Sequence, residues 1–239
     1  NNVPFVSSNN MFYSAGPMAQ PYPGQTTAVG QQGYAAIEVA NTDLNFTIPG
    51  NIIHSLSNGI VGRRANMSVS GCTMMHIQPD AAYASPQNGS GIYARGGHGF
   101  FTLKQAGFGM SGGGTSFNNC RWGIYTERMN VRSEQNQMAQ VGTAYHIERS
   151  GYMDIDIWNN RLDTKFDGIQ LYMNDGCAHM LVQNNDITFA TNPPFGQFVK
   201  GYTAIVVKEA NTANPNSVIQ NNTIRYRPGA TTAHGGIKL

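Results

Sequence analysis

The chain has 239 residues, enough to bury a sizeable core, yet only 12% of them are charged and the formal net charge is +2. A typical globular protein carries about 25% charged residues. So small a net charge, without any run of Lys or Arg, argues against a nucleic-acid partner. No stretch is long and apolar enough to span a bilayer, so we also expect no membrane insertion.

Glycine is frequent, with 28 residues, and asparagine is abundant. Both residue types tolerate left-handed backbone conformations, so this composition is typical of short strands joined by turns. Exposed helical faces, by contrast, are usually lined with Glu and Lys. The cysteines have no metal-ligand spacing and cannot all pair within one chain. We expect small buried thiols at Cys72, Cys120 and Cys177.

The first part of the chain differs from the rest. Residues 1–32 contain Pro, Gly, Gln and Ser without a period, which indicates an extended lead-in or the end of a preceding module. Over residues 33–239 a unit repeats. We expect this part to be a segment of a longer solenoid, because both ends would otherwise expose an uncapped core. The expected neighbours are then flanking domains or copies of the chain arranged end to end.

A small residue followed by Ile marks each repeating unit, with Tyr replacing Ile once. The pairs recur every 21–24 residues, or every 32–36 residues where a loop is inserted. They are Ala36-Ile37, Gly59-Ile60, Gly91-Ile92, Gly123-Ile124, Ala144-Tyr145, Gly168-Ile169, Ala204-Ile205 and Gly236-Ile237.

An asparagine motif is the second landmark of the unit. The hexapeptide of residues 157–162 (IWNNRL) recurs as residues 182–187 (VQNNDI) and as residues 219–224 (IQNNTI). Residues 48–53 form a related copy, and residues 69–74 have Cys where the other copies have Asn. Together with the small–Ile pairs, these copies divide the chain into units of similar pattern.

Two stretches fit the motif less well. Residues 131–138 match it only with extra residues before Asn136, and residues 100–122 fit worst, because Gly123-Ile124 follows their Asn-Asn pair almost at once. The latter stretch could form either a single regular unit or one that contains a bulge.

The unit length and the alternation of apolar residues predict the fold class. A unit of about 22 residues with two or three short alternating runs is too small for a helix pair or a propeller blade, and it lacks the Leu spacing of a leucine-rich repeat. It matches one rung of a parallel β-helix, whose inward side chains stack on their copies in adjacent rungs. We therefore expect an all-β, right-handed parallel β-helix of about seven or eight rungs. Loop insertions are expected at residues 78–90, 191–201 and 227–235.

The repeated asparagines have a structural interpretation. A corner between two sheets needs a residue that accepts a left-handed backbone, and Asn does so at modest cost. Its amide can also hydrogen-bond to the Asn of the next rung, which satisfies polar groups at a buried corner. Ordinary surface turns are the alternative, but they do not explain the fixed Ile-x-x-Asn-x-Ile frame. We expect a structural ladder formed by Asn51, Asn160, Asn185 and Asn222.

This repeated "I-x-N-N-x-I … G-I" pattern resembles the right-handed parallel β-helix proteins of the pectin-lyase-like superfamily. It is most similar to the repeat regions of large secreted bacterial surface proteins, and the resemblance covers residues 33–239. That superfamily includes lyases, hydrolases, phage tailspikes and noncatalytic adhesins. The resemblance therefore implies the fold and an extracellular or cell-surface location, and leaves the activity open.

Three tripeptides look like the catalytic motifs of polygalacturonases, which share this fold: Asn41-Thr42-Asp43, Gly97-His98-Gly99 and Gly236-Ile237-Lys238. The register separates the second from the third by about five rungs, or some 24 Å at roughly 4.8 Å per rung. A hydrolytic site also needs two carboxylates within roughly 5–10 Å, and the sequence shows no such pair. We interpret the tripeptides as chance matches.

The register predicts two outward columns on one sheet. The first column consists of Glu38, Val61, Tyr93, Tyr125, His146, Gln170, Val206 and Lys238. The second column, two residues further along each strand, consists of Ala40, Arg63, Arg95, Glu127, Glu148, Tyr172 and Lys208.

The centre of these columns forms a candidate ligand-binding surface. Aromatic faces stack on the C–H faces of sugars, and charged neighbours hydrogen-bond to hydroxyls or carboxylates. A plain solvated sheet is the alternative, because Tyr has a high strand propensity and an Arg opposite a Glu is an ordinary cross-strand ion pair. We call this surface the candidate sugar face: Tyr93, Tyr125, His146, Arg63, Arg95, Glu127, Glu148 and Tyr172.

An acidic group is the other candidate site. Oxygen-rich clusters suit Ca²⁺, but no Asp-x-Asp-x-Asp-Gly loop is present, so a solvated strand face is the alternative interpretation. The histidines show no i, i+4 pair and no convergent third ligand for zinc. We therefore expect no metal and no cofactor. The acidic group consists of Asp154, Asp156, Asp163 and Asp167.

Two functions from different classes remain. The first is a noncatalytic extracellular β-helix module, a stalk or adhesin segment of a secreted bacterial surface protein, with polysaccharide as its expected ligand. The second is a polysaccharide lyase or glycoside hydrolase acting on an acidic polysaccharide. A lyase would need a base to abstract the proton α to a uronate carboxylate, and the candidates are His146, Tyr125, Arg95 and Arg63. We favour the first function, because the sequence shows no convergent acid pair, metal loop or matching catalytic motif.

Overall fold

The structure of the chain is a computed structural model. It describes residues 6–13, 34–79, 86–96, 107–110, 114–189, 203–209, 217–226 and 235–239, with side chains at all of these except residues 42–45 and 107–110. The described residues form strands, turns and bends, and no helix occurs among them. The expected all-β class is therefore confirmed for this part of the chain.

The first sheet has eight parallel strands in the order β1-β3-β5-β8-β11-β14-β17-β20. Its strands are short, because a corner follows each of them. Their bounds are Met11–Tyr13 for β1, Ile52–His54 for β3, Thr73–Met75 for β5, Ser116–Asn118 for β8, Gln137–Val141 for β11, Arg161–Thr164 for β14, Asp186–Phe189 for β17 and Thr223–Tyr226 for β20.

The second sheet has 13 parallel strands. Beyond β4 (Asn58–Ser70) it divides into two series of strands, which we call the first arm and the second arm. The long strands β2 (Ala35–Pro49) and β4 run through both arms, since β4 pairs with β6 near its start and with β7 near its end. The first arm continues through β6 (Ser90–Arg95), β9 (Trp122–Glu127), β12 (Thr143–Glu148), β15 (Ile169–Tyr172), β18 (Thr203–Lys208) and β21 (Gly235–Lys238). The second arm continues through β7 (Gly107–Met110), β10 (Asn130–Glu134), β13 (Asp154–Trp158), β16 (His179–Gln183) and β19 (Val218–Gln220).

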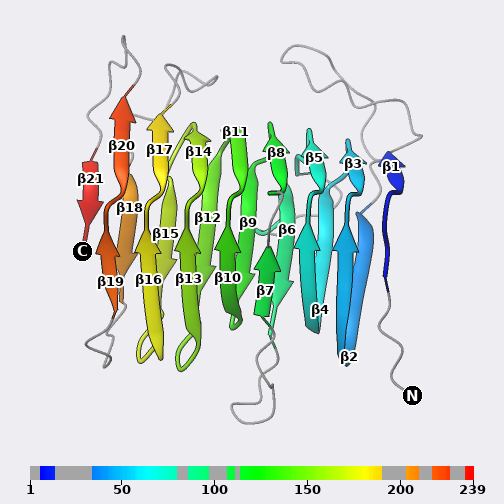
Figure 1. Cartoon of the computed structure of the whole chain (residues 1–239), viewed down its shortest axis with the longest axis horizontal. Coiled ribbons are helices and arrows are strands. Elements are labelled where there is room, and N and C mark those ends of the chain that lie inside the picture. The colour runs from blue at the N-terminus through cyan, green and yellow to red at the C-terminus, as the bar shows by residue number, and fades with distance from the viewer. Residues whose placement is uncertain are drawn as a thin grey trace.

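The chain visits these ladders in a fixed cycle. Strands β12, β13 and β14 enter the first arm, the second arm and the first sheet in turn, and β15, β16 and β17 then pair with them in the same order. We call each such set of strands a rung. Figure 1 shows successive rungs side by side along the long axis, from blue near the N-terminus to red near the C-terminus. This arrangement is consistent with the solenoid that the repeats predict.

The sequence-derived register of the small–Ile pairs is confirmed along the first arm. Each Ile, or the Tyr that replaces it, pairs with its counterpart one rung away. The continuous file is Ile37, Ile60, Ile92, Ile124, Tyr145, Ile169, Ile205 and Ile237. Within the segment that the sequence assigned to a lead-in, Met11–Tyr13 form β1 and pair with β3 of the first sheet, and Val6 forms an isolated bridge with Thr47.

Alternation along each strand builds the core. On β13, Ile155 and Ile157 are fully buried, whereas Asp154, Asp156 and Trp158 between and beside them are partly exposed. A fully buried Ile side chain stabilises the fold by roughly 1.5–3 kcal/mol relative to an exposed one. Because each rung repeats the pattern, the buried side chains form files through the interior.

Close backbone approach explains the small residue of the small–Ile pairs. A Cβ atom on Gly168 would overlap the backbone oxygen of Ala204 in the next rung, and one on Gly91 would overlap the ring of Phe117. At these corners the chain leaves no room for a larger side chain. The small residue is thus a packing requirement of the stack rather than a need for unusual backbone angles.

The asparagines of the last four rungs are joined by hydrogen bonds at one buried corner. The side-chain amide of Asn136 donates to Oδ1 of Asn160 at 3.0 Å, Asn160 donates to Asn185 at 2.9 Å, and Asn185 donates to Asn222 at 2.9 Å. Each backbone N–H donates to the same oxygen. Asn136, whose segment fitted the motif poorly, is therefore part of this ladder.

Asn51 belongs to a separate pair. Its Oδ1 accepts hydrogen bonds from the backbone and side chain of Asn10, at 2.9 and 3.1 Å. Cys72 occupies the equivalent corner of the next rung and donates to the backbone oxygen of Ile48 instead. The expected ladder of Asn51 with the later asparagines is thus interrupted, because a thiol cannot continue the amide chain.

The sequence predicted that one Asn of each motif both turns the corner and forms the ladder. In the structure, two neighbouring asparagines share these roles. Asn159, Asn184 and Asn221, the first of each Asn-Asn pair, have φ of 56°, 55° and 55° and turn the corner. The second Asn of each pair forms the ladder. Asn accepts this left-handed conformation more easily than other non-glycine residues, which explains why the motif contains two asparagines.

The expectation of buried thiols is confirmed. Cys72, Cys120 and Cys177 are all free and each is 1% exposed. Burial raises the pKa of each thiol, and that of Cys120 rises to about 12. Such thiols are protonated at neutral pH and fill space as small apolar groups.

Candidate functional site

The register places the residues of the candidate sugar face next to one another on the outer side of the first arm. Tyr93, Tyr125 and His146 lie in consecutive paired positions on β6, β9 and β12. The charged column runs beside them, with Arg95 paired to Glu127 and Glu127 paired to Glu148. Both outward columns therefore have the register that the sequence predicts.

We call Tyr93, Tyr125 and His146 the aromatic file. The expectation that its side chains are exposed is wrong. Only 4% of Tyr93 and 8% each of Tyr125 and His146 are exposed. With Val61, the two tyrosines form a small hydrophobic cluster separate from the main core. Their faces are therefore not an open platform on which a sugar ring could stack.

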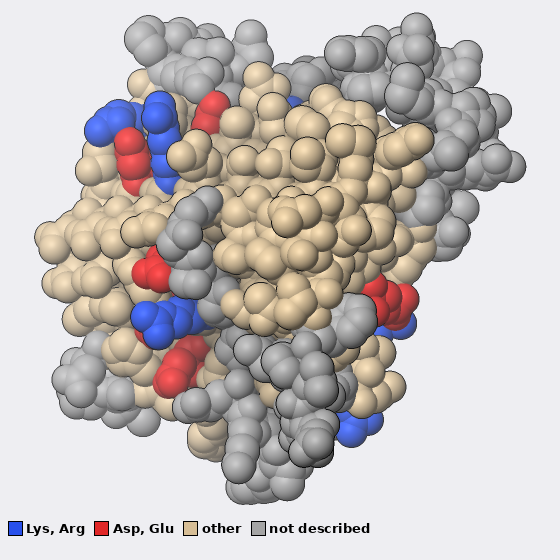
Figure 2. All heavy atoms as spheres, turned by 45° about the vertical axis from the view of Figure 1, so that its right-hand side comes forward, with Lys and Arg blue, Asp and Glu red and all other residues tan. Residues whose placement is uncertain are grey.

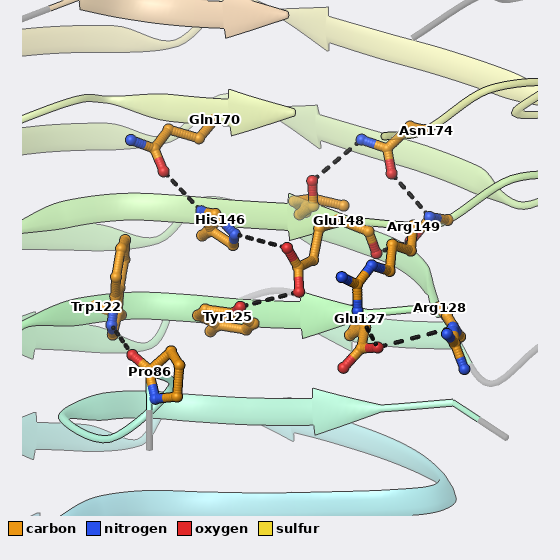
Figure 3. A network of polar contacts seen from close by, with 12 residues as sticks. Pro86, Trp122, Tyr125, Glu127, Arg128, His146, Glu148, Arg149, Gln170 and Asn174 are labelled. Atoms are coloured by element: carbon orange, nitrogen blue, oxygen red, sulfur yellow. Dashed lines mark hydrogen bonds and ion pairs between the residues drawn. The ribbon is translucent and has the colours of Figure 1, made fainter. Parts of the chain in front are cut away.

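The spacing of the rungs explains this burial, because the rings pack against one another. Tyr125 and His146 stack with centroids 4.5 Å apart, and Tyr93 meets Tyr125 edge-on at 5.7 Å. Trp122 closes the side of the file, with its ring 5.6 Å from that of Tyr125. Its indole N–H donates to the backbone oxygen of Pro86 at 3.1 Å, as Figure 3 shows.

Glu127 is a buried carboxylate neutralised by arginines. Only 7% of the residue is exposed, and its oxygens lie 3.3 Å from Arg95, 3.7 Å from Arg128 and 3.2 Å from Arg149. A buried charge is costly unless it is paired. The three guanidinium groups supply that pairing.

Glu148 is bound by the aromatic file itself (Figure 3). The hydroxyl of Tyr125 donates to its Oε1 at 3.0 Å, and Nε2 of His146 lies 3.4 Å from its Oε2. The hydrogen bond from His146, together with that from Tyr125, lowers the pKa of Glu148 below its usual value. The ionised carboxylate is thereby held in place.

The other nitrogen of His146 continues the network. Nδ1 of His146 is hydrogen-bonded to Oε1 of Gln170 at 2.6 Å, and the amide nitrogen of Gln170 donates to Oδ2 of Asp167 at 2.5 Å. The backbone N–H of Thr203 donates to the other oxygen of Asp167 at 2.7 Å. Hydrogen bonds thus run without interruption from Tyr125 to Thr203 across four adjacent strands of the first arm and the turn before β15.

Two carboxylates lie side by side at the centre of this network. Glu127 and Glu148 are paired on adjacent strands, although the sequence showed no acid pair. Like charges opposite each other are destabilising. The arginines around Glu127 and the donors around Glu148 offset that repulsion, so both groups are tied into the protein.

The tyrosines of the file are poorly suited to act as bases. Burial, reinforced by the carboxylate of Glu148, raises the pKa of Tyr125, and burial likewise raises that of Tyr93. A catalytic base needs a pKa near the working pH, so a tyrosine base would need a lowered value. At neutral pH both phenols keep their protons, and that of Tyr125 donates to Glu148.

The outer members of the candidate sugar face are more accessible. Arg63 forms an ion pair with Glu38 at 3.2 Å and donates a hydrogen bond to the hydroxyl of Tyr34 at 2.7 Å. Both of these partners lie outside the central network. Tyr172 is partly exposed, with its ring edge-on to that of His146 at 5.4 Å. These residues frame the buried centre.

A cleft of about 630 Å³ opens at the C-terminal end of the same columns. Its lining includes Tyr172, Val206, Lys208, Lys238 and Asp167. The volume lies within the range of small-molecule sites. The cleft therefore begins at Tyr172, on the strand next to that of His146, and extends to β21, away from the buried centre.

Several residues of the network escaped the sequence analysis. Arg128 and Arg149 each follow a glutamate of the column at a corner with positive φ. Aligning that corner position across the repeats would have revealed both arginines. Asp167 was considered only as a Ca²⁺ ligand, and Trp122 precedes a small–Ile pair without any repeated counterpart.

The other candidates do not converge. Asp156 pairs with His179 at 2.9 Å on the second arm, whereas Asp167 belongs to the network of the first arm. Within the ranges that the structure describes, no group of three or more His, Cys, Asp or Glu residues could hold a metal ion. Segment 97–99 lies outside the described residues, as do the side chains of Thr42 and Asp43.

Charge is sparse on the face of the molecule that Figure 2 shows. Most of its charged residues form small groups in which basic and acidic side chains lie together, and most of the described residues on this face are uncharged. In the part of the chain that the structure describes, no helix is long and apolar enough to cross a membrane. No family model, curated protein or solved structure matches the chain.

Proposed function

We propose that the chain is a noncatalytic extracellular module that binds polysaccharide, with the fold of a right-handed parallel β-helix of the pectin-lyase-like type. As a rigid stalk or adhesin segment it would belong to a secreted bacterial surface protein. The proposal combines the stacked parallel ladders with the resemblance of the repeated Asn and small–Ile motifs. A stack whose rungs contact only their neighbours forms an extended, rigid body, which suits such a role.

The observation that carries the noncatalytic part is the closed network around Tyr125, His146 and Glu148. Every side chain in it already donates to or accepts from another residue of the chain. The pKa of Glu148 is lowered and that of Tyr125 is raised, the reverse of what a catalytic acid and a catalytic base require. We infer that this network stabilises the surface beside the ligand rather than acting on the ligand.

One observation favours a glycoside hydrolase instead. Glu127 and Glu148 lie on adjacent strands at paired positions, and retaining glycosidases use two carboxyl groups about 5–5.5 Å apart. The arginines around Glu127 count against this second candidate, since the oxygens of Glu127 are already paired with three guanidinium groups.

A glycan array followed by product analysis separates the two functions. The module predicts binding to at least one class of polysaccharide and recovery of that polysaccharide unchanged. New reducing ends would identify a hydrolase, and new unsaturated ends would identify a lyase. The absence of binding to any glycan would contradict the proposal. Glu127→Gln and Glu148→Gln serve as controls, because they should leave binding intact if neither residue acts on the ligand.

A further inference from the structure

The cleft at the C-terminal end of the first arm brings two lysines together. Lys208 on β18 pairs with Tyr172, and Lys238 on the neighbouring strand β21 pairs with Val206, two residues before Lys208. Such diagonal neighbours lie about 7–8 Å apart across a sheet. Their flexible four-carbon stems allow both ammonium groups to reach a single anionic group.

Neither lysine is strongly engaged by the protein. Lys208 lies 3.7 Å from Glu209, but the two side chains are 69% and 52% exposed, and exposed pairs of this kind contribute little. Lys238 has no carboxylate partner among the described residues. Of the two acidic residues that line the cleft, Glu209 is the exposed neighbour of Lys208, and Asp167 already accepts two hydrogen bonds from the protein. Both cations therefore remain available to a ligand.

The cleft also offers an apolar surface and a donor. Val206 and the ring of Tyr172 contribute to its lining. Burial raises the pKa of Tyr172, so its phenol stays protonated and can donate a hydrogen bond at neutral pH. A sugar ring could place its C–H face on these apolar groups while a charged substituent faces the lysines.

We propose that this cleft binds a saccharide that carries a tetrahedral oxyanion, such as a sulfate ester or a phosphate. The identity of the cations supports this class of ligand. A tetrahedral oxyanion presents three acceptor oxygens in different directions, so two lysines that act as point charges can bind it together, whereas a carboxylate presents only two coplanar oxygens. The inference rests on the proposed function, because it names the ligand of a polysaccharide-binding module.

The test compares three polymers and two sets of variants. Dextran sulfate, polygalacturonate and uncharged dextran are titrated into the chain in the same buffer. The double variant Lys208→Gln, Lys238→Gln removes both cations from the cleft. Arg161→Gln is the matched control, since it removes an exposed cation from β14 in the first sheet, away from the cleft.

We expect dextran sulfate to bind at least tenfold more tightly than polygalacturonate, and the double variant to lose roughly tenfold or more in affinity. Arg161→Gln should bind as the unchanged chain does. Inorganic sulfate and phosphate, added as competitors, distinguish the two oxyanions, because the better match displaces the polymer at the lower concentration. Added salt should weaken binding, since exposed charges are screened.

Other outcomes overturn the inference. Unchanged affinity in the double variant would exclude the cleft, and an equal loss in Arg161→Gln would show that attraction to the surface is unspecific. Tighter binding of polygalacturonate would reject the oxyanion. Binding of uncharged glycans alone would reject the inference and leave the proposed function standing, whereas failure to bind any polysaccharide would contradict both.

Discussion

Asn160 donates both its backbone N–H and its side-chain amide to Oδ1 of Asn185, at 3.1 and 2.9 Å. One oxygen thus satisfies two donors of the rung before it. Because both residues are buried, water cannot replace this acceptor. The corner that joins the second arm to the first sheet therefore depends on the same residue type recurring at each rung.

Replacing Asn185 by Ala should destabilise the fold by about 2–6 kcal/mol, because two buried donors of Asn160 lose this acceptor at a cost of about 1–3 kcal/mol each. Urea denaturation measures the loss. Asn222→Ala is the control, since Asn222 is partly exposed and water can reach the donors of Asn185. We expect it to cost about 1 kcal/mol or less. Equal losses for the two variants would contradict the importance of burial.

Gly168→Ala should destabilise the fold by about 1–3 kcal/mol, the usual cost of overpacking. The added Cβ would overlap the backbone oxygen of Ala204, which cannot move without shifting the next rung. Gly236→Ala is a matched control from the same motif, because its Cβ would meet only the Cδ1 atom of Ile224 at an ordinary distance of 3.8 Å. Thermal unfolding of both variants tests the prediction, and similar melting temperatures would argue against a steric role for Gly168.

Glu148 should make the fold sensitive to acid. Its pKa in the folded chain is lowered, so the stabilisation is present above the unfolded value and disappears as the pH falls through the folded value. Urea midpoints measured from pH 7 to pH 3 should fall more steeply for the unchanged chain than for Glu148→Gln, which cannot titrate. Parallel curves for the two proteins would show that the bonds from His146 and Tyr125 do not favour the ionised carboxylate.

The three thiols should react slowly in the folded chain. Each is buried with a raised pKa, and the thiolate is the reactive form. Alkylation at pH 8 should therefore label Cys72, Cys120 and Cys177 only slowly, whereas unfolding in urea should expose all three to rapid labelling. Mass spectrometry locates the modified residues. Rapid labelling of Cys120 without denaturant would contradict its position in the core.

The repeats carried most of the information about the fold. The small–Ile pairs predicted the register of the first arm, and the structure pairs Ile37 through Ile237 accordingly. Period and alternation suffice for this result, since a one-residue slip would turn every buried side chain outward. Asn136 was missed as a ladder residue because its local spacing departs from the other copies.

The chemistry of the site was less accessible from the sequence. The register placed Tyr125 and His146 correctly, but their exposure depended on contacts between rungs and with Trp122, which no pattern within a rung reveals. The sequence identifies both Glu127 and Glu148 as members of the second column. It predicts an ion pair of Glu127 with Arg95 and a ligand contact for Glu148, but not that the two carboxylates are neighbours. Burial and hydrogen bonding, which determine their pKa values, arise only in the folded chain.

The most direct test of the account is the length of a polysaccharide recovered after it has bound to the chain. The account predicts measurable binding at equilibrium and an unchanged size distribution after prolonged incubation at neutral pH. A shift to shorter chains would show that the paired carboxylates or the aromatic file act on the ligand, and the noncatalytic assignment would then be wrong.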